Sequence, residues 1–311
     1  MKKTNVIAVL ALAATPVLLK AQTTSYSDVV GYSKISAAAG TVAVTPGFVK
    51  AAKFSGSATI TGQSLNISGL TADSLNASSY GDRPNYPTHY VEITSGTYEG
   101  YSFDIVSNTA SSVTAQNIPS ALNGQSVSVV IRPHFVLDDI ASASMADYAD
   151  AVNLINPDGS TSTRFYAGGS WIAEDFSTPA GHTVIYPGQA VVLSTGGASI
   201  TTQGVVKATK TAIPLYAAAV NFVGPLNPSG NTLVNSLGIA GGLTPYADGI
   251  NVFSSDGNLT ATATYFSDGS SILDSGFSPL DPNATDNVQV NSGFAVSVAS
   301  DTYWVVPSPI E

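Results

Sequence analysis

Few residues of this chain have the types and spacing that catalysis requires. Its three histidines, His89, His134 and His182, stand far apart in the sequence, whereas a zinc hydrolase of the common helical type carries His-Glu-x-x-His. The pentapeptide Gly-x-Ser-x-Gly, which places a reactive serine on a strained turn, does not occur. We therefore predict no catalytic residue and expect that the protein is not an enzyme.

Two pairs of adjacent acids are the remaining candidates for acid–base chemistry. Glycoside hydrolysis needs two carboxyl groups roughly 5 to 10 Å apart, and Asp138-Asp139 and Glu174-Asp175 are the pairs that could supply them. Adjacent acids on loops are solvated surface in most proteins. We favour that interpretation for both pairs.

No metal site and no cofactor are predicted, and calcium is the ion that comes nearest. Oxygen ligands are available from Asp281, Asn283 and Asp286 within one short segment, and calcium binds through oxygen. The segment lacks the turn glycine and the later bidentate glutamate of an EF-hand loop. A plain Asx turn between two strands is the preferred interpretation.

Aromatic side chains give the one indication of a ligand. Tyr166 and Trp171, with Trp304 near the C-terminus, are candidate ligand contacts because an exposed aromatic face can stack on a sugar ring. Packing of Trp171 in the core is the favoured interpretation.

These aromatic residues belong to a duplicated segment with a spacing of about 100 residues. Both copies start with Tyr-Ala-Asp, continue through an Asp-Gly pair and an aromatic pair, and align Trp171 with Ser271. Apolar and polar residues alternate on each side of the Asp-Gly pairs, which is typical of antiparallel hairpins. Each copy is therefore predicted to be a β-meander.

The predicted fold class is all-β, with antiparallel meanders that form two related β domains, sandwich or barrel-like. At most one short helix is expected, near 137–149, where Asp138 and Asp139 suit a first turn. The predicted first half covers 22–200, with an entry segment, an extra β section at 63–136 and a meander at 148–195. The predicted second half covers 201–311, with an entry segment at 204–236 and a meander at 246–300.

The first 21 residues have the layout of a secretory signal peptide. Lys2 and Lys3 precede an apolar stretch at 6–14, and a small residue, Ala21, marks the expected cleavage point. The apolar stretch is too short to span a bilayer, so we predict a secreted or cell-surface protein with no membrane span after cleavage. The chain has no cysteine, so its stability cannot depend on disulfides.

Charge and composition narrow the choice of partners. The net charge is −10, and removal of the leader takes away three lysines and no acid. Nucleic acid is excluded as a partner because no cluster of Lys and Arg is present to bind phosphates. Charged residues make up only 10% of the chain, against about 25% in an ordinary domain, which suits contact with like chains or surface polymer.

Several short motifs resemble a group of exported, β-rich bacterial proteins found chiefly in Verrucomicrobia. The motifs are Val29-Val30-Gly31-Tyr32, Gly100-Tyr101-Ser102-Phe103, Ile131-Arg132-Pro133-His134-Phe135, Ala149-Asp150, Trp171 and Ile185-Tyr186-Pro187-Gly188. The resemblance implies export and a shared β architecture. No activity is assigned to that group, so no functional residue is carried over.

Together these observations predict an exported, non-enzymatic structural or interaction protein of the extracellular space or cell surface. Its expected partners are itself or a surface polysaccharide, with noncovalent attachment to the cell. A carbohydrate-binding module that uses exposed aromatic residues is the alternative. An outer-membrane barrel comes third, because the strand-like runs are shorter than such a barrel requires.

Overall fold

The structure of the protein is a computed structural model, and it is described for residues 29–233, 237–253, 259, 261–281, 287–288 and 293–309. Within these residues the regular structure is almost entirely antiparallel β-strand, which confirms the all-β class. The signal peptide with its cleavage point after Ala21, and the calcium candidates Asn283 and Asp286, lie outside the described residues.

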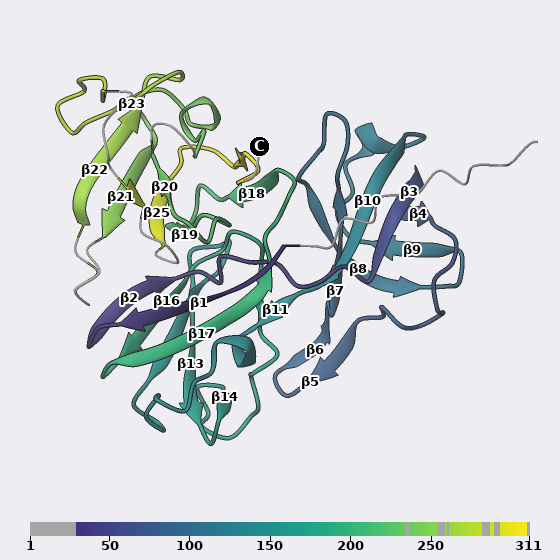
Figure 1. Ribbon diagram of the computed structural model, residues 1–311, viewed down its shortest axis with the longest axis horizontal. Helices are drawn as coiled ribbons and strands as arrows, with labels where there is room; N and C mark the ends of the chain where they lie inside the picture. Colours follow the sequence, from purple (N-terminus) through teal and green to yellow (C-terminus); the bar gives the residue numbers. More distant parts are fainter. Residues whose placement is uncertain are drawn as a thin grey trace, which may run out of the picture.

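The strands form three bodies, each with its own apolar core (Figure 1). We call residues 30–50 and 134–206 the first unit, residues 54–133 the barrel, and residues 211–306 the second unit. The barrel is inserted into the first unit. It lies to the right in Figure 1, whereas the first unit lies at the lower left and the second unit at the upper left.

The strands of the first unit are β1 Val30–Ala37, β2 Gly40–Val44, β11 Phe135–Val136, β12 Ala151–Ile155, β13 Thr161–Ala167, β14 Ser170–Ile172, β15 Val184–Ile185, β16 Val191–Thr195 and β17 Ala198–Val205. Five of them form an antiparallel sheet in the order β14-β13-β12-β16-β2, while β1 pairs with β17 and β11 with β15. Alternate residues point inward, so Val152 and Leu154 of β12 pack with Ile200 of β17 in one core.

The strands of the second unit are β18 Thr211–Leu215, β19 Asn221–Val223, β20 Asn231–Thr232, β21 Gly249–Phe253, β22 Ala261–Ser267, β23 Ile272–Leu273, β24 Asn287–Val288, β25 Phe294–Ser297 and β26 Thr302–Val306. They repeat the first unit strand for strand, with a sheet in the order β23-β22-β21-β25-β19 and the pairs β18–β26 and β20–β24. The duplication therefore covers each unit as a whole.

Strand register corrects the alignment of the two copies. Ala151 pairs with Phe165 in the first unit as Gly249 pairs with Phe266 in the second, so the two phenylalanines are equivalent. Trp171 then corresponds to Ile272, and its alignment with Ser271 was wrong by one residue. The difference matters because a shift of one residue moves a side chain to the other face of a sheet.

The barrel strands are β3 Phe54–Thr61, β4 Ser64–Asn66, β7 His89–Ile93, β8 Ser102–Asn108, β9 Ser112–Ala115 and β10 Ser126–Pro133. They close in the order β10-β3-β4-β9-β8-β7, and apolar side chains fill the interior. The expected extra section at 63–136 thus begins earlier, because Phe54–Thr61 pairs with both β10 and β4. Likewise β17 pairs along its whole length with β1, so the first unit extends past residue 200.

Helical structure in the described chain is limited to three 3₁₀ turns, η1 Ser120–Leu122, η2 Leu137–Ile140 and η3 Ala240–Gly242. The expected helix near 137–149 is reduced to η2. Ser142 and Ser144 follow it, and both hydroxyls donate to the carbonyl of Ser199, which diverts the chain from a helical path. None of the helices in this part of the chain is long and apolar enough to cross a membrane.

Candidate functional site

The three aromatic residues predicted to contact a ligand lie in the cores. Trp171 and Trp304 are each 0% exposed and Tyr166 is 5% exposed. The indole nitrogens donate hydrogen bonds of 2.8 Å to the carbonyls of Leu137 and Leu237. The favoured interpretation of Trp171 as a core residue is therefore confirmed, and the three residues do not present faces to a sugar, because each indole finds its polar partner inside the fold.

The histidines and the paired acids are engaged in separate contacts. His134 lies with Nε2 3.0 Å from Asp104, and His182 stacks on Tyr80 with ring centroids 3.7 Å apart. Asp139 accepts the backbone N–H of Val136 at 2.8 Å. These groups brace the barrel and the first unit rather than converge on one point.

Metal-ligand chemistry finds little support in the described part of the chain. No group of three or more His, Cys, Asp or Glu side chains there is arranged to hold a metal ion. Asp281, the calcium candidate that is described, is exposed. The plain Asx turn that the sequence favours for this segment stays a prediction, because Asn283 and Asp286 lie outside the described residues.

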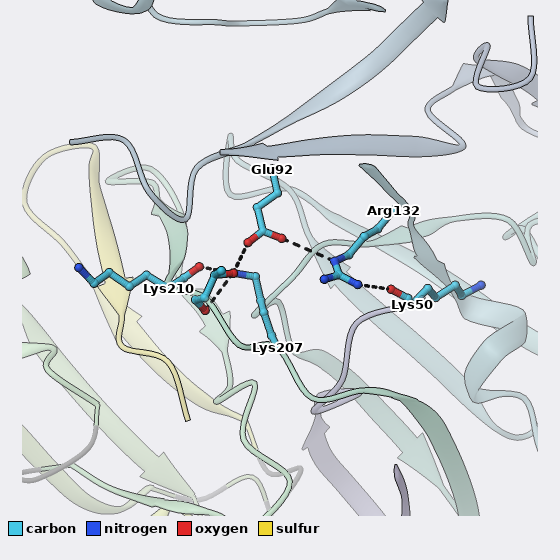
Figure 2. Close-up of polar contacts among 6 residues, drawn as sticks. Lys50, Glu92, Arg132, Lys207 and Lys210 are labelled. Carbon is cyan, nitrogen blue, oxygen red and sulfur yellow. Dashed lines mark hydrogen bonds and ion pairs between the residues drawn. The ribbon is translucent and has the colours of Figure 1, made fainter. Parts of the chain in front are cut away.

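A buried ion cluster joins all three bodies, and we define it as Glu92, Arg132 and Lys207. Glu92 of β7 lies between the other two (Figure 2), with Oε1 2.7 Å from the Lys207 ammonium and Oε2 3.7 Å from Arg132 Nε. Thr209 also donates to Glu92. Burial lowers the pKa of Lys207, and the Glu92 carboxylate opposes that shift.

The ion cluster connects the segments by which the bodies are attached to one another. Arg132 donates to the carbonyl of Lys50 at 2.9 Å, in the chain that leads into the barrel. Lys207 donates to the carbonyl of Lys210, in the chain that leads into the second unit. All three charges are at least nine-tenths buried, so the ion cluster is a structural junction that offers little access to a substrate.

Two equivalent aromatic surfaces remain, one on each unit. We define the first aromatic patch as Tyr148, Phe165 and Phe176, and the second as Tyr246, Phe266 and Phe277. Both tyrosines are 61% exposed, and Phe176 and Phe277 are 52% and 50% exposed. Exposed apolar groups of this size, repeated at equivalent positions, indicate contact surfaces.

The rings of the two patches have nearly the same arrangement. The ring centroids of Phe165 and Phe176 are 4.5 Å apart at 29°, and those of Phe266 and Phe277 are 4.8 Å apart at 32°. The tyrosine ring lies 6.4 Å from Phe176 in the first patch. The corresponding distance in the second patch is 6.1 Å. A phenylalanine from the loop thus forms the centre of each patch.

The tyrosine and the central phenylalanine of each patch have left-handed backbones. Their φ angles are +59° and +57° for Tyr148 and Phe176, and +58° and +61° for Tyr246 and Phe277. A bulky residue in this region is unusual and costs about 1–3 kcal/mol. Such strain at equivalent positions of both copies argues that the exposed rings serve a purpose other than folding.

A buried aspartate positions the tyrosine of each patch. Asp150 accepts the backbone N–H of Ala146 and of Gly196, both at 3.0 Å. Asp248 accepts the N–H of Thr244 at 2.7 Å and of Ala299 at 2.8 Å. These bonds join the loop before the tyrosine to the turn that follows β16 in the first unit and β25 in the second. They explain why the aspartate of the Tyr-Ala-Asp sequence is repeated.

An aspartate shapes the loop that carries each central phenylalanine. Asp175 accepts the N–H groups of Ser177 and Thr178 at 2.9 and 2.8 Å, and hydrogen bonding, above all from the Thr178 hydroxyl, lowers its pKa to about 2. In the second unit Asp274 accepts the N–H of Ser278 at 2.9 Å. Both acids accept backbone N–H groups and so hold a tight turn around the phenylalanine.

The sequence carries a signal for the patches in addition to the motifs described above. Both copies have a Phe-Ser step shortly before a proline, at Phe176-Ser177 and Phe277-Ser278. Paired with the repeated Tyr-Ala-Asp, this step marks the two loops that meet in each patch. Trp171 and Trp304 are the more prominent candidates for ligand contact in the sequence only because tryptophan is the larger residue.

Comparison with known proteins adds no relative. No family model matches the chain, and neither the curated proteins nor the solved structures contain a match. The resemblance to exported proteins of Verrucomicrobia therefore stays a prediction.

Proposed function

We propose that this chain is an exported, non-enzymatic interaction protein of the cell exterior that binds a neutral polysaccharide through its two aromatic patches. The observation that carries the proposal is the duplicated, strained and exposed ring arrangement of Tyr148 with Phe176 and Tyr246 with Phe277. Exposed aromatic faces suit the apolar faces of sugar rings, whereas polar groups at the rim suit their hydroxyls.

Charge favours a neutral ligand over an anionic one. The sequence contains no lysine, arginine or histidine after Lys210, so the second unit has no cationic side chain with which to bind phosphate, sulfate or uronate. The first patch is flanked in sequence by the acids Asp147, Glu174 and Asp175. An anionic polymer would be repelled by these acids at the first patch and would find no cationic partner at the second.

Patch size favours a sugar chain over a folded protein partner. Each patch has three rings, two of them about half exposed, which is far less surface than the roughly 800 Å² per partner of a stable protein–protein interface. The acids that flank the first patch would also repel one another in a contact between the first patches of two like chains.

The test is retention of the purified protein on hydroxyethyl cellulose, laminarin and galactomannan in affinity electrophoresis. The double variant Phe176→Asn/Phe277→Asn should lose about tenfold or more in affinity, equivalent to about 1.4 kcal/mol or more. Asparagine accepts the left-handed backbone, so the fold is kept. Tyr32→Ser, at a tyrosine that is 79% exposed outside both patches, is the matched control and should bind as the wild type does.

Self-association is a second candidate, favoured by a specific feature of β1. This eight-residue strand pairs with β17 on one side, and Val30 and Tyr32 are 73% and 79% exposed. Long exposed strands are surfaces on which another chain can add a strand. Concentration-dependent growth in light scattering without sugar, abolished by Tyr32→Pro, would support it; a constant monomer mass would exclude it.

A further inference from the structure

The two aromatic patches lie at opposite ends of a continuous pair of sheets. In the first unit Phe165 lies on β13 and Phe176 follows β14, which is the outermost strand of its sheet; in the second unit β22 and β23 have the same places. Figure 1 shows β14 at the bottom of the molecule and β23 at the top. The patches are therefore carried at the two outer edges.

Backbone hydrogen bonds join the inner edge strand of each sheet to the other sheet. The Ala190 N–H, just before β16, donates to the carbonyl of Phe222 on β19 at 3.0 Å, and the Gly293 N–H, just before β25, donates to that of Ala43 on β2 at 3.0 Å. Each five-stranded sheet adds roughly 20 Å between its edges, from four spacings of about 4.8 Å. Both sheets thus separate one patch from the other.

Close packing makes this junction stiff. A side chain at Gly293 would collide with Ala190 and Ala43, and one at Gly224 would collide with Thr45. Glycine at these two positions lets the backbones approach closely. Because close-packed surfaces do not deform continuously, the junction acts as a rigid spacer that keeps the patches apart.

Each patch also has what it needs to bind by itself. The ring distances, the exposed fractions and the left-handed backbones agree between the two copies, and each copy has its own buried aspartate, Asp150 or Asp248. The two patches are therefore separate sites of similar strength rather than halves of one site.

We propose that the protein is a cross-linker that holds two neutral polysaccharide chains, one at each aromatic patch. This inference rests on the proposed function and adds its consequence: one molecule joins two polymer chains. A network formed in this way needs two sites for each molecule and no contact between like proteins.

The experiment is a sandwich assay. It uses whichever of hydroxyethyl cellulose, laminarin and galactomannan retains the protein most strongly in affinity electrophoresis. That polymer is fixed to a surface, the protein is bound, and the same polymer carrying a fluorescent label is added in solution. The wild type should capture the labelled polymer. Phe176→Asn and Phe277→Asn should each still bind the surface, but the captured label should fall about tenfold or more, because the second site is lost.

The outcomes separate this inference from the function on which it rests. Single variants that still capture labelled polymer as the wild type does would overturn cross-linking and leave polysaccharide binding intact. A double variant that still binds the surface as the wild type does, or a wild type that binds none of the three polymers, would overturn both. Circular dichroism of each variant identifies any loss that comes from unfolding.

Discussion

In the first unit Trp171 lies on β14, a strand of the five-stranded sheet. In the second unit Trp304 lies on β26, which pairs with β18 outside the five-stranded sheet. Both indoles fill a core and donate at 2.8 Å to a leucine carbonyl, Leu137 or Leu237, in the connection that precedes the sheet. The position of Trp171 is taken by Ile272 in the other copy. A core needs volume and satisfied polar groups, and different strands can supply them.

The two cores are filled from different strands, whereas the two surface patches are built from equivalent residues. Tyr148 and Tyr246 have φ angles within one degree of each other, and Phe176 and Phe277 differ by four degrees. Even the turn acids, Asp175 and Asp274, arise at different distances before the phenylalanine and still hold it in the same place. The contrast shows that the exposed rings are the feature common to both units, although they strain the backbone.

Charge is the second difference between the units. The ion cluster of Glu92, Arg132 and Lys207 holds the barrel against the connection between the first and second units, while the second unit has no cationic side chain of its own. The first unit carries an inserted barrel, and burying charges at the junction fixes how the insert is attached.

The largest effect is expected from Glu92→Gln. Removal of the Glu92 charge leaves two buried cations, Arg132 and Lys207, without a counter-charge. The free energy of unfolding of the barrel and first unit should therefore fall by about 3–5 kcal/mol. Hydrogen exchange resolved by segment would measure it, with the second unit as internal reference. The double variant Glu92→Leu/Lys207→Met, which removes the charge pair, should cost much less; an equal loss would contradict the role of charge.

A matched pair, Asp150→Ala and Asp248→Ala, tests whether the copies are equivalent. Each change leaves two backbone N–H groups without an acceptor and should lower the free energy of unfolding by about 1–3 kcal/mol. Denaturant unfolding of both variants measures the two costs. Values that differ by more than about 1 kcal/mol would mean that the two aspartates do not have the same role.

Acid should destabilise the barrel more than the second unit. Burial, then the nearby charges of His134, Lys53 and Lys50, lower the pKa of His89 from 6.5 to about 4. The unfolded chain therefore takes up the proton first, and stability present above pH 6.5 is lost as the pH falls toward 4. For this half-buried ring the loss is about 1 kcal/mol after solvent screening.

Unfolding followed between pH 7 and pH 4 by segment-resolved hydrogen exchange would measure that loss. His89→Gln should flatten the pH dependence of the barrel. The second unit contains no histidine, so an equally steep profile there would assign the effect to other groups.

The smallest effect on stability is expected from Phe176→Asn and Phe277→Asn. Release of about 1 kcal/mol of backbone strain should nearly offset the loss of a ring contact worth about 0.5–1.5 kcal/mol. The free energy of unfolding, measured by thermal denaturation, should therefore change by less than about 1 kcal/mol in either variant. A loss above about 2 kcal/mol would show that these rings stabilise the fold like core residues.

Local patterns were enough to predict the strands and their turns. Residues alternate around Asp158-Gly159, and the structure has a hairpin there, with Ile155 paired to Thr161 and Gly159 at φ +83°. The duplication was equally visible, because equivalent hairpins keep similar sequences. These features depend on neighbours in the chain, so the sequence alone determined them.

Only the tertiary structure decided which aromatic residues are buried. Phe165-Tyr166 must point to opposite faces of its strand, but period two does not say which face meets the core. Tyr148 and Phe176 stand 28 positions apart in the sequence, and Glu92, Arg132 and Lys207 come from three separate segments. Such groups meet only when the sheets pack, because that is when distant segments exclude water from one another.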